Sequence, residues 1–346
     1  MTVNQGFGLG LAAVIAAVVS LGLKVLPREN MQILASIPVR RRADGLWRGI
    51  NLTWYGVLQA AAMVSAVGLG LILATAARVP TSQIAAVAAV LIAVALPAAR
   101  GVAFLVERRR GTFTVGGAIF VATLAMPWTA LAADAYFGTA NALAMVASLS
   151  AGYATGEGVG RLACISFGCC YGRRLSECPD WLRSLFEGRP AVVVGSTRKA
   201  AYASGCDGVP LLPVPALSAV MLSGAGVAAS LLFLAGEFRA SALVALGVAF
   251  VWRFASEFVR ADYRGKGRLS AYQWMALGCL AYAIPVVLAL SGGGERPDIG
   301  RCVELVTSPL AWIALGALGI GVFAYLGIST VTTATIELGV DDRFRG

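Results

Sequence analysis

Several charged residues of this chain lie inside or at the ends of long apolar stretches, and they are the first candidates for chemistry. A charged side chain at membrane depth is costly, and it usually faces a cavity or a partner of opposite charge. These residues are Arg100, Asp134, Glu157, Arg161, Arg253, Glu257 and Arg260. Glu157 and Arg161 are four residues apart, so they share one face of any helix that continues through both.

A second group has the spacing of a single helix stripe. Arg253, Glu257 and Arg260 occupy positions i, i+4 and i+7. Two guanidinium groups around one carboxylate leave net positive charge, and the planar fork of arginine donors suits a phosphate diester. The alternative is an internal salt bridge that locks two helices together. The spacing alone favours neither interpretation.

A run of small residues and cysteines follows, from Gly160 to Gly172, and reads G-R-L-A-C-I-S-F-G-C-C-Y-G. We predict irregular backbone here, because such backbone is tolerated at membrane depth where it lines a cavity. Free amides beside Arg161 would then form an anion site. No C-x-x-C pair occurs among the seven cysteines, so the sequence predicts no metal site and no cofactor. Histidine, the commonest general base, is absent.

The elements that must position these residues are membrane helices. The chain has 346 residues, of which 58% are apolar and 13% charged, whereas soluble domains contain about a quarter charged residues. Nine stretches of mostly apolar residues are long enough to cross a bilayer as helices, and none alternates as a barrel strand does. They are 5–23, 52–77, 83–106, 113–133, 139–159, 214–236, 239–259, 270–291 and 308–330. We predict an all-α, polytopic membrane protein with about nine transmembrane helices.

We expect three parts along the chain. Residues 1–50 supply an extra helix, retained rather than cleaved as a signal peptide, and a basic amphipathic segment along the headgroup layer. A solvated basic loop is the alternative for that segment. Residues 51–291 form a core of about seven helices, including a polar head loop at 172–212. Residues 292–346 add a last helix and a tail.

Basic residues are distributed unevenly between the loops. When the loops are joined alternately, most lysines and arginines outside the spans fall on the side of the Gly160–Gly172 run. The positive-inside tendency places that side in the cytoplasm, but the same residues could instead face outward and bind anionic headgroups. The formal net charge of +10 indicates attraction to anionic lipid. No segment resembles a nucleic-acid-binding module.

The Gly160–Gly172 run resembles the signature of the prolipoprotein diacylglyceryl transferase family, in a variant that reads G-R-x-x-C-x-x-x-G-C-C-Y-G. Further pieces that resemble family motifs occur in order over about residues 50–290. They are Trp54-Tyr55-Gly56 (W-Y-G), Arg100 (G-R), Gly116-Gly117 (H-G-G), Arg253 to Arg260 (R-F-x-x-E-F-x-R), and Leu269-Ser270 with Gln273 (L-S-x-x-Q).

The resemblance implies a reaction and a set of site residues. The family transfers a diacylglyceryl group from phosphatidylglycerol to the thiol of a lipobox cysteine and releases glycerol phosphate. It implies that Arg161 and Arg253 hold the lipid phosphate, that Arg260 assists, and that Glu257 orients Arg253. It also implies that Tyr55 forms a hydrogen bond near the headgroup and that Gly172 permits a turn of the loop. The other implied substrate-binding positions are Arg100, Gly116, Gly117, Glu157 and Cys164.

The chain departs from the family pattern where the acceptor would be activated. The histidine of H-G-G is replaced by Val115, the asparagine of G-R-x-x-N by Cys164, and an acidic residue of the same loop by Cys169. The family's Q-L-Y-E is replaced by the sequence P-V-P-A-L at residues 213–217.

Three candidates could replace the missing base. Cys169 or Cys170 could act as a thiolate favoured by neighbouring arginines, Glu157 could act as the base, or the acceptor could bring its own. The alternative for the cysteines is a role as small buried hydrophobes or as disulfide partners.

Three functions therefore remain open. The leading one is a phospholipid-dependent transferase in the bacterial inner (cytoplasmic) membrane, with phosphatidylglycerol as diacylglyceryl donor and a lipobox protein as acceptor. The second is an enzyme of the same fold that modifies a sugar, a polyol or a small headgroup. The third is a non-enzymatic lipid-binding or transport protein, although no paired repeat typical of transporters is visible.

Overall fold

The computed structural model describes residues 2–107, 115–261, 268–292, 295–339 and 343. Within these ranges, eight helices are long and apolar enough to cross a membrane. They are α1 (Val3–Val25), α2 (Trp54–Ala76), α3 (Thr81–Glu107), α4 (Val115–Phe137), α8 (Val214–Leu234), α9 (Phe238–Ser256), α10 (Ala271–Ala289) and α12 (Pro309–Leu326). The prediction of a polytopic helical membrane protein is confirmed.

The ninth predicted span coincides with α5 (Ala142–Phe167), which lies inside the bundle. This 26-residue helix packs against α2, α4, α8 and α9, and most of its residues are buried. It is less apolar than the others because it carries Glu157, Arg161 and many small polar residues. Its polar groups meet protein rather than lipid, which makes them tolerable at membrane depth.

Glycines allow α5 to approach its neighbours closely. A Cβ atom at Gly152 would collide with the carbonyl oxygen of Ala66 on α2, and one at Gly158 would collide with Ser223 on α8. Small residues at such contacts are typical of membrane helix pairs. The predicted irregular backbone from Gly160 to Gly172 is observed only after Phe167. Residues 160–167 continue α5 because their small side chains pack helix against helix, whereas Gly168 and Cys170 are left-handed.

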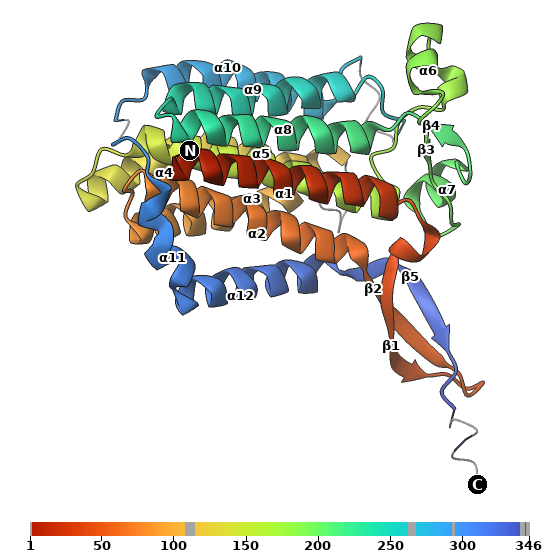
Figure 1. Ribbon diagram of the computed structural model, residues 1–346. Helices are drawn as coiled ribbons and strands as arrows, with labels where there is room; N and C mark the ends of the chain where they lie inside the picture. The colour runs from red at the N-terminus through yellow and green to blue at the C-terminus, as the bar shows by residue number, and fades with distance from the viewer. Residues whose placement is uncertain (1, 108–114, 262–267, 293–294, 340–342, 344–346) are drawn as a thin grey trace.

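The helices run side by side between two ends of the molecule (Figure 1). One end carries the head segment between α5 and α8. It contains η2 (Leu175–Glu177), α6 (Asp180–Phe186), β3 (Ala191–Val192), α7 (Lys199–Ser204) and β4 (Pro210–Leu211). The other end carries the N-terminus, η3 (Ile299–Cys302) and α11 (Val303–Thr307).

The head segment is fastened to the end of α1. Arg198 is 1% exposed, and its guanidinium donates hydrogen bonds to the carbonyl oxygens of Leu26, Pro27 and Arg28. Because the last carbonyls of a helix have no partner within it, a buried cation there is favourable. The basic segment after α1 therefore lies at the head end, as the alternation of loops predicts. The basic residues at 108–110, 264 and 266 lie outside the described residues.

A three-stranded antiparallel sheet projects from the head end beyond the bundle (Figure 1). Its order is β1 (Ile33–Arg41), β2 (Trp47–Thr53) and β5 (Ile328–Ile336), and η1 (Glu29–Met31) precedes it. The β1–β2 hairpin turns at Gly45, whose φ of +86° suits glycine. The Asn51 side chain donates a 3.0 Å hydrogen bond to Thr332, linking β2 to β5.

The sheet differs from one prediction. The basic segment before residue 50 is a β-hairpin rather than an amphipathic stretch or loop, so a small sheet accompanies the helical bundle. The sheet also joins residues of the N-terminal part to residues of the C-terminal part. The sequence pattern missed it because β5 lies about 280 residues after β2, and because its Thr, Val and Ile residues favour a strand only when a partner is present.

Candidate functional site

A cavity lies between α5, α8 and α9, toward the head end of the bundle. It is lined by Glu157, Arg161, Cys170, Val214, Ser218, Leu222, Ala249, Trp252, Arg253, Ser256 and Arg260. Five of these were predicted from the sequence as substrate-binding or catalytic residues: Glu157, Arg161, Cys170, Arg253 and Arg260. The structure therefore brings the two separate arginine motifs of the sequence to one place.

Glu157 is the centre of the charged cluster. It accepts hydrogen bonds from Arg161, from Tyr153 and, at 3.1 Å, from Nη1 of Arg253. The side chains of Glu157, Arg161 and Arg253 are only 8%, 16% and 15% exposed. Two cations around one carboxylate leave net positive charge in a dry site, where electrostatic interactions are strong. Glu157 and Arg161 share one face of α5, as their spacing predicts, and they form an ion pair there.

Arg161 keeps one unused donor. Its Nε is buried and has no hydrogen-bond acceptor among the residues that the structure describes. A buried donor without a partner is costly, and such groups are rare in native structures. Because Arg161 also lines the cavity, an anionic oxygen bound there would satisfy this donor.

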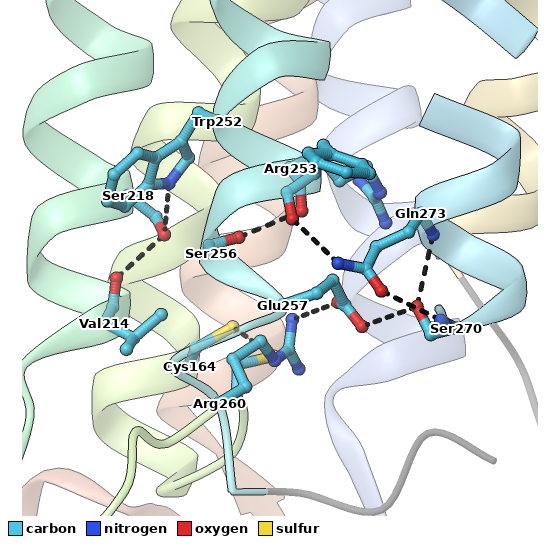
Figure 2. Close-up of polar contacts among 12 residues, drawn as sticks. Cys164, Val214, Ser218, Trp252, Arg253, Ser256, Glu257, Arg260, Ser270 and Gln273 are labelled. Atoms are coloured by element: carbon cyan, nitrogen blue, oxygen red, sulfur yellow. Dashed lines mark hydrogen bonds and ion pairs between the residues drawn. The ribbon is translucent and has the colours of Figure 1, made fainter. Parts of the chain in front are cut away.

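Arg253 and Glu257 do not form the predicted pair. Helix α9 ends at Ser256, so Glu257 and Arg260 lie in the following turn rather than on one helix stripe. Arg260 approaches Glu257 at 3.5 Å, while the ion pair of Arg253 is with Glu157. Figure 2 shows Glu257 between Arg260 and Ser270, away from the Arg253 side chain.

The L-S-x-x-Q motif holds this turn in place. Ser270 and Gln273 form a capping box at the start of α10, and Ser270 also donates a 3.1 Å hydrogen bond to Glu257. Gln273 donates to the carbonyl oxygen of Phe254 near the end of α9 (Figure 2). The motif thus positions Glu257 by joining two helix ends, a role that the sequence reasoning did not assign.

Cys164, Cys169 and Cys170 form a cluster beside the arginines. Their three Sγ atoms all lie within 4.8 Å of one another, and Sγ of Cys164 is 3.7 Å from Sγ of Cys170. Hydrogen bonds from Cys164 and then from Cys169 hold the pKa of the Cys170 thiol well below its ordinary value; the charges of Arg260 and Arg161 add to this effect and burial opposes it. The sequence indicated the separate cysteines but not their convergence.

Gly172 and Arg260 lie on two paired segments next to this cluster. The N–H of Arg173 donates to Val259 at 3.0 Å, and a bridge pairs Gly172 with Arg260. A Cβ atom at Gly172 would lie 2.5 Å from the carbonyl oxygen of Leu212. Glycine is therefore needed here for close packing and not, as predicted, for a turn.

Other predicted site residues lie near the cavity or outside it. A Cβ atom at Gly116 would lie 2.6 Å from Nη2 of Arg253, so this glycine makes room for the guanidinium, whereas Gly117 faces Val102 of α3. The Tyr55 ring packs on Phe167, near the cysteines, and no hydrogen bond of its hydroxyl is found among the described residues. The side chain of Val115 lies outside the described part of the chain.

Two charged candidates have structural roles elsewhere. Arg100 is exposed on α3 and donates to the Tyr325 hydroxyl of α12 at 2.9 Å, so it does not line the cavity. Asp134 accepts hydrogen bonds from the N–H groups of Asn141 and Ala142 at the start of α5, at the end opposite the head segment. The prediction of Arg100 as a substrate-binding residue therefore finds no support in its position.

The family model of prolipoprotein diacylglyceryl transferase matches residues 46–289, which run from β2 to the end of α10 and include the whole cavity. Neither a curated protein nor a solved structure gives a match.

Proposed function

The chain belongs to the prolipoprotein diacylglyceryl transferase family, a family of membrane transferases, and from this premise we propose that it uses phosphatidylglycerol as the donor of a diacylglyceryl group. The observation that carries this proposal is the buried Arg161–Glu157–Arg253 cluster with its unused Arg161 Nε donor. A phosphodiester oxygen is the acceptor that such a site lacks, because guanidinium donors match phosphate geometry.

The proposed reaction is a displacement at the glyceryl carbon that bears the phosphate. The acceptor attacks this carbon, the carbon–oxygen bond breaks, and the bonding electrons leave with the phosphate as glycerol phosphate. Arg161 and Arg253 bind the phosphate and stabilise the charge that grows on it, since fixed donors in a water-poor site favour developing negative charge. Glu157 holds both guanidiniums in place, and Arg260 approaches from the turn after α9.

For the acceptor, a lipobox cysteine is the family's substrate, and a sugar, a polyol or a small headgroup is the second candidate. The replacement of the family's histidine by Val115 and of its Q-L-Y-E by residues 213–217 favours the second. We place the protein in the bacterial inner membrane, where both phosphatidylglycerol and lipoproteins occur.

Mass spectrometry tests the donor and the acceptor together. The purified protein is incubated with phosphatidylglycerol, with and without a lipobox peptide, and glycerol phosphate and lipid-modified products are measured. We expect glycerol phosphate release that falls about 100-fold or more in Arg161→Ala and in Arg253→Ala, with Arg40→Ala on the exposed sheet as the matched control. Normal release by both cavity variants would falsify the phosphate site. A modified peptide identifies a protein acceptor, and release without one directs the search to small acceptors.

A further inference from the structure

The cysteine cluster has the dimensions of a metal site. Zinc–thiolate bonds are about 2.3 Å long, and a tetrahedral arrangement of them places sulfur atoms about 3.8 Å apart. Sγ of Cys164 and Sγ of Cys170 are 3.7 Å apart, and Cys169 completes a set in which no pair exceeds 4.8 Å. All three thiols are free of disulfides. Three thiol sulfurs converging on one point are a ligand set for zinc.

The backbone that brings these sulfurs together is conformationally strained. Gly168 ends α5 in the left-handed region with φ of +71°, and the N–H groups of Gly168 and Cys169 both donate to the carbonyl oxygen of Cys164. Cys170 is also left-handed, with φ of +57°, which is unusual for a residue other than glycine. Strained backbone of this kind persists where the surrounding structure imposes it and is concentrated at functional sites.

Two guanidiniums lie beside the cluster and favour the thiolate of Cys170, whereas hydrogen bonds with Cys164 and Cys170, together with burial, hold the pKa of the Cys169 thiol above its ordinary value. Arg161 interacts electrostatically with Cys164 and Cys170, and Arg260 interacts with Cys170 from the turn after α9. Three thiolates around a divalent ion carry one net negative charge, which these guanidiniums balance. Cys170 also lines the cavity that contains Glu157 and Arg253, so the cluster adjoins the proposed phosphate site.

We propose that Cys164, Cys169 and Cys170 bind a zinc ion as three thiolates and leave its fourth position open to the acceptor. Three protein ligands with an open position characterise catalytic zinc sites, whereas structural sites have four. Zinc deprotonates a thiol that binds it and lowers the pKa of a bound hydroxyl. The site thus supplies the acceptor activation that the family assigns to the histidine replaced here by Val115; this role rests on the proposed function.

The step balances without a change in oxidation state. The acceptor X–H binds zinc as X⁻ and releases its proton to water. X⁻ then attacks the glyceryl carbon of the donor, forming an X–C bond while the C–O bond to phosphate breaks. The electron pair of that bond stays on the phosphate oxygen, where Arg161 and Arg253 bind it, and glycerol phosphate leaves. Zinc remains divalent throughout.

The closing experiment measures metal content apart from activity. Full-length protein is purified without chelator, and its zinc is measured by inductively coupled plasma mass spectrometry. We expect about one zinc ion per chain, lost in Cys164→Ser, Cys169→Ser and Cys170→Ser and retained in the control variants Cys206→Ser and Cys279→Ser. Cys169→His replaces one zinc ligand by another and is expected to keep the metal. If it does, the loss of zinc in Cys169→Ser reflects the missing ligand and not a misfolded protein. Cobalt substitution is expected to give thiolate charge-transfer absorption in the wild type and in the variants that keep the metal, and none in the three serine variants of the cluster.

Several outcomes would overturn the zinc site. They are wild-type protein without zinc, zinc that persists when all three cysteines are replaced, or a disulfide between two of the three in the purified protein. Failure of the proposed function looks different, because zinc would then be bound while phosphatidylglycerol releases no glycerol phosphate. Unchanged transfer by zinc-free protein would instead reject the catalytic role and leave the donor intact.

Discussion

The arginines of α5 and α9 and the arginines of the β1–β2 hairpin lie toward the same end of the molecule but in opposite environments. Arg161 and Arg253 are about 15% exposed and share a buried carboxylate. In the hairpin, Arg40 and Arg48 are exposed and lie directly opposite each other on neighbouring strands. Among the described residues, no ion pair involves either of them; Arg42 alone in the hairpin pairs, with Asp44.

The difference shows that position, more than residue type, decides what an arginine can do. In the cavity, low effective dielectric makes each charge interaction strong and fixes the guanidinium planes. On the sheet, water and salt screen the charges within about 10 Å. In the cavity, the two guanidiniums are therefore held in one geometry by Glu157, whereas on the sheet the exposed arginines remain solvated.

The largest difference in stability between the two regions is expected when one carboxylate is removed from each. Glu157→Gln leaves two buried guanidiniums without a counter-charge, and we expect a loss of about 3–5 kcal/mol in stability. Asp44→Asn breaks the exposed pair with Arg42 and is expected to cost at most about 1 kcal/mol. Thermal unfolding in detergent micelles measures both. Equal effects of the two substitutions would show that the buried cluster is as solvated as the sheet.

Glycine substitutions compare the packing of the two regions. Gly152→Ala drives a methyl group into the carbonyl oxygen of Ala66, which cannot move without α2, so we expect a loss of about 1–3 kcal/mol. Gly49→Ala on β2 meets first the end of the Ile336 side chain, which can rotate, and a smaller loss is expected. The unfolding temperatures of the two variants show which substitution lowers stability more. A larger loss for Gly49→Ala would contradict the view that α5 is the more tightly packed element.

The smallest effect is expected from the like charges on the sheet. Arg48→Gln removes the repulsion between Arg48 and Arg40, so we expect a gain of about 0.2–1 kcal/mol at low salt. The gain disappears at high salt because exposed charges are screened. Unfolding at two salt concentrations measures it. A change in stability that does not depend on salt would mean that Arg48 acts through packing. The same measurement on Arg161→Gln gives the corresponding change for an arginine of the buried cluster.

Local patterns in the sequence predicted the features that depend on near neighbours. Apolar stretches of about 20 residues located all nine long helices, because helix length follows from bilayer thickness. The position of Glu157 and Arg161 on one helix face followed from the helical repeat. Motifs in order along the chain indicated the family that the match over residues 46–289 shows.

Features that join distant segments were decided by the tertiary structure alone. Arg253 pairs with Glu157 across 96 residues, and the expected pairing with Glu257 fails because α9 ends at Ser256. The spacing of Cys164, Cys169 and Cys170 has no zinc-like pattern along the chain, and a left-handed turn after α5 is needed to bring the sulfurs together. The sequence thus determined which helices form and which family they belong to. Packing decided which charges and thiols meet, since a contact between segments depends on where each helix ends and not on local spacing.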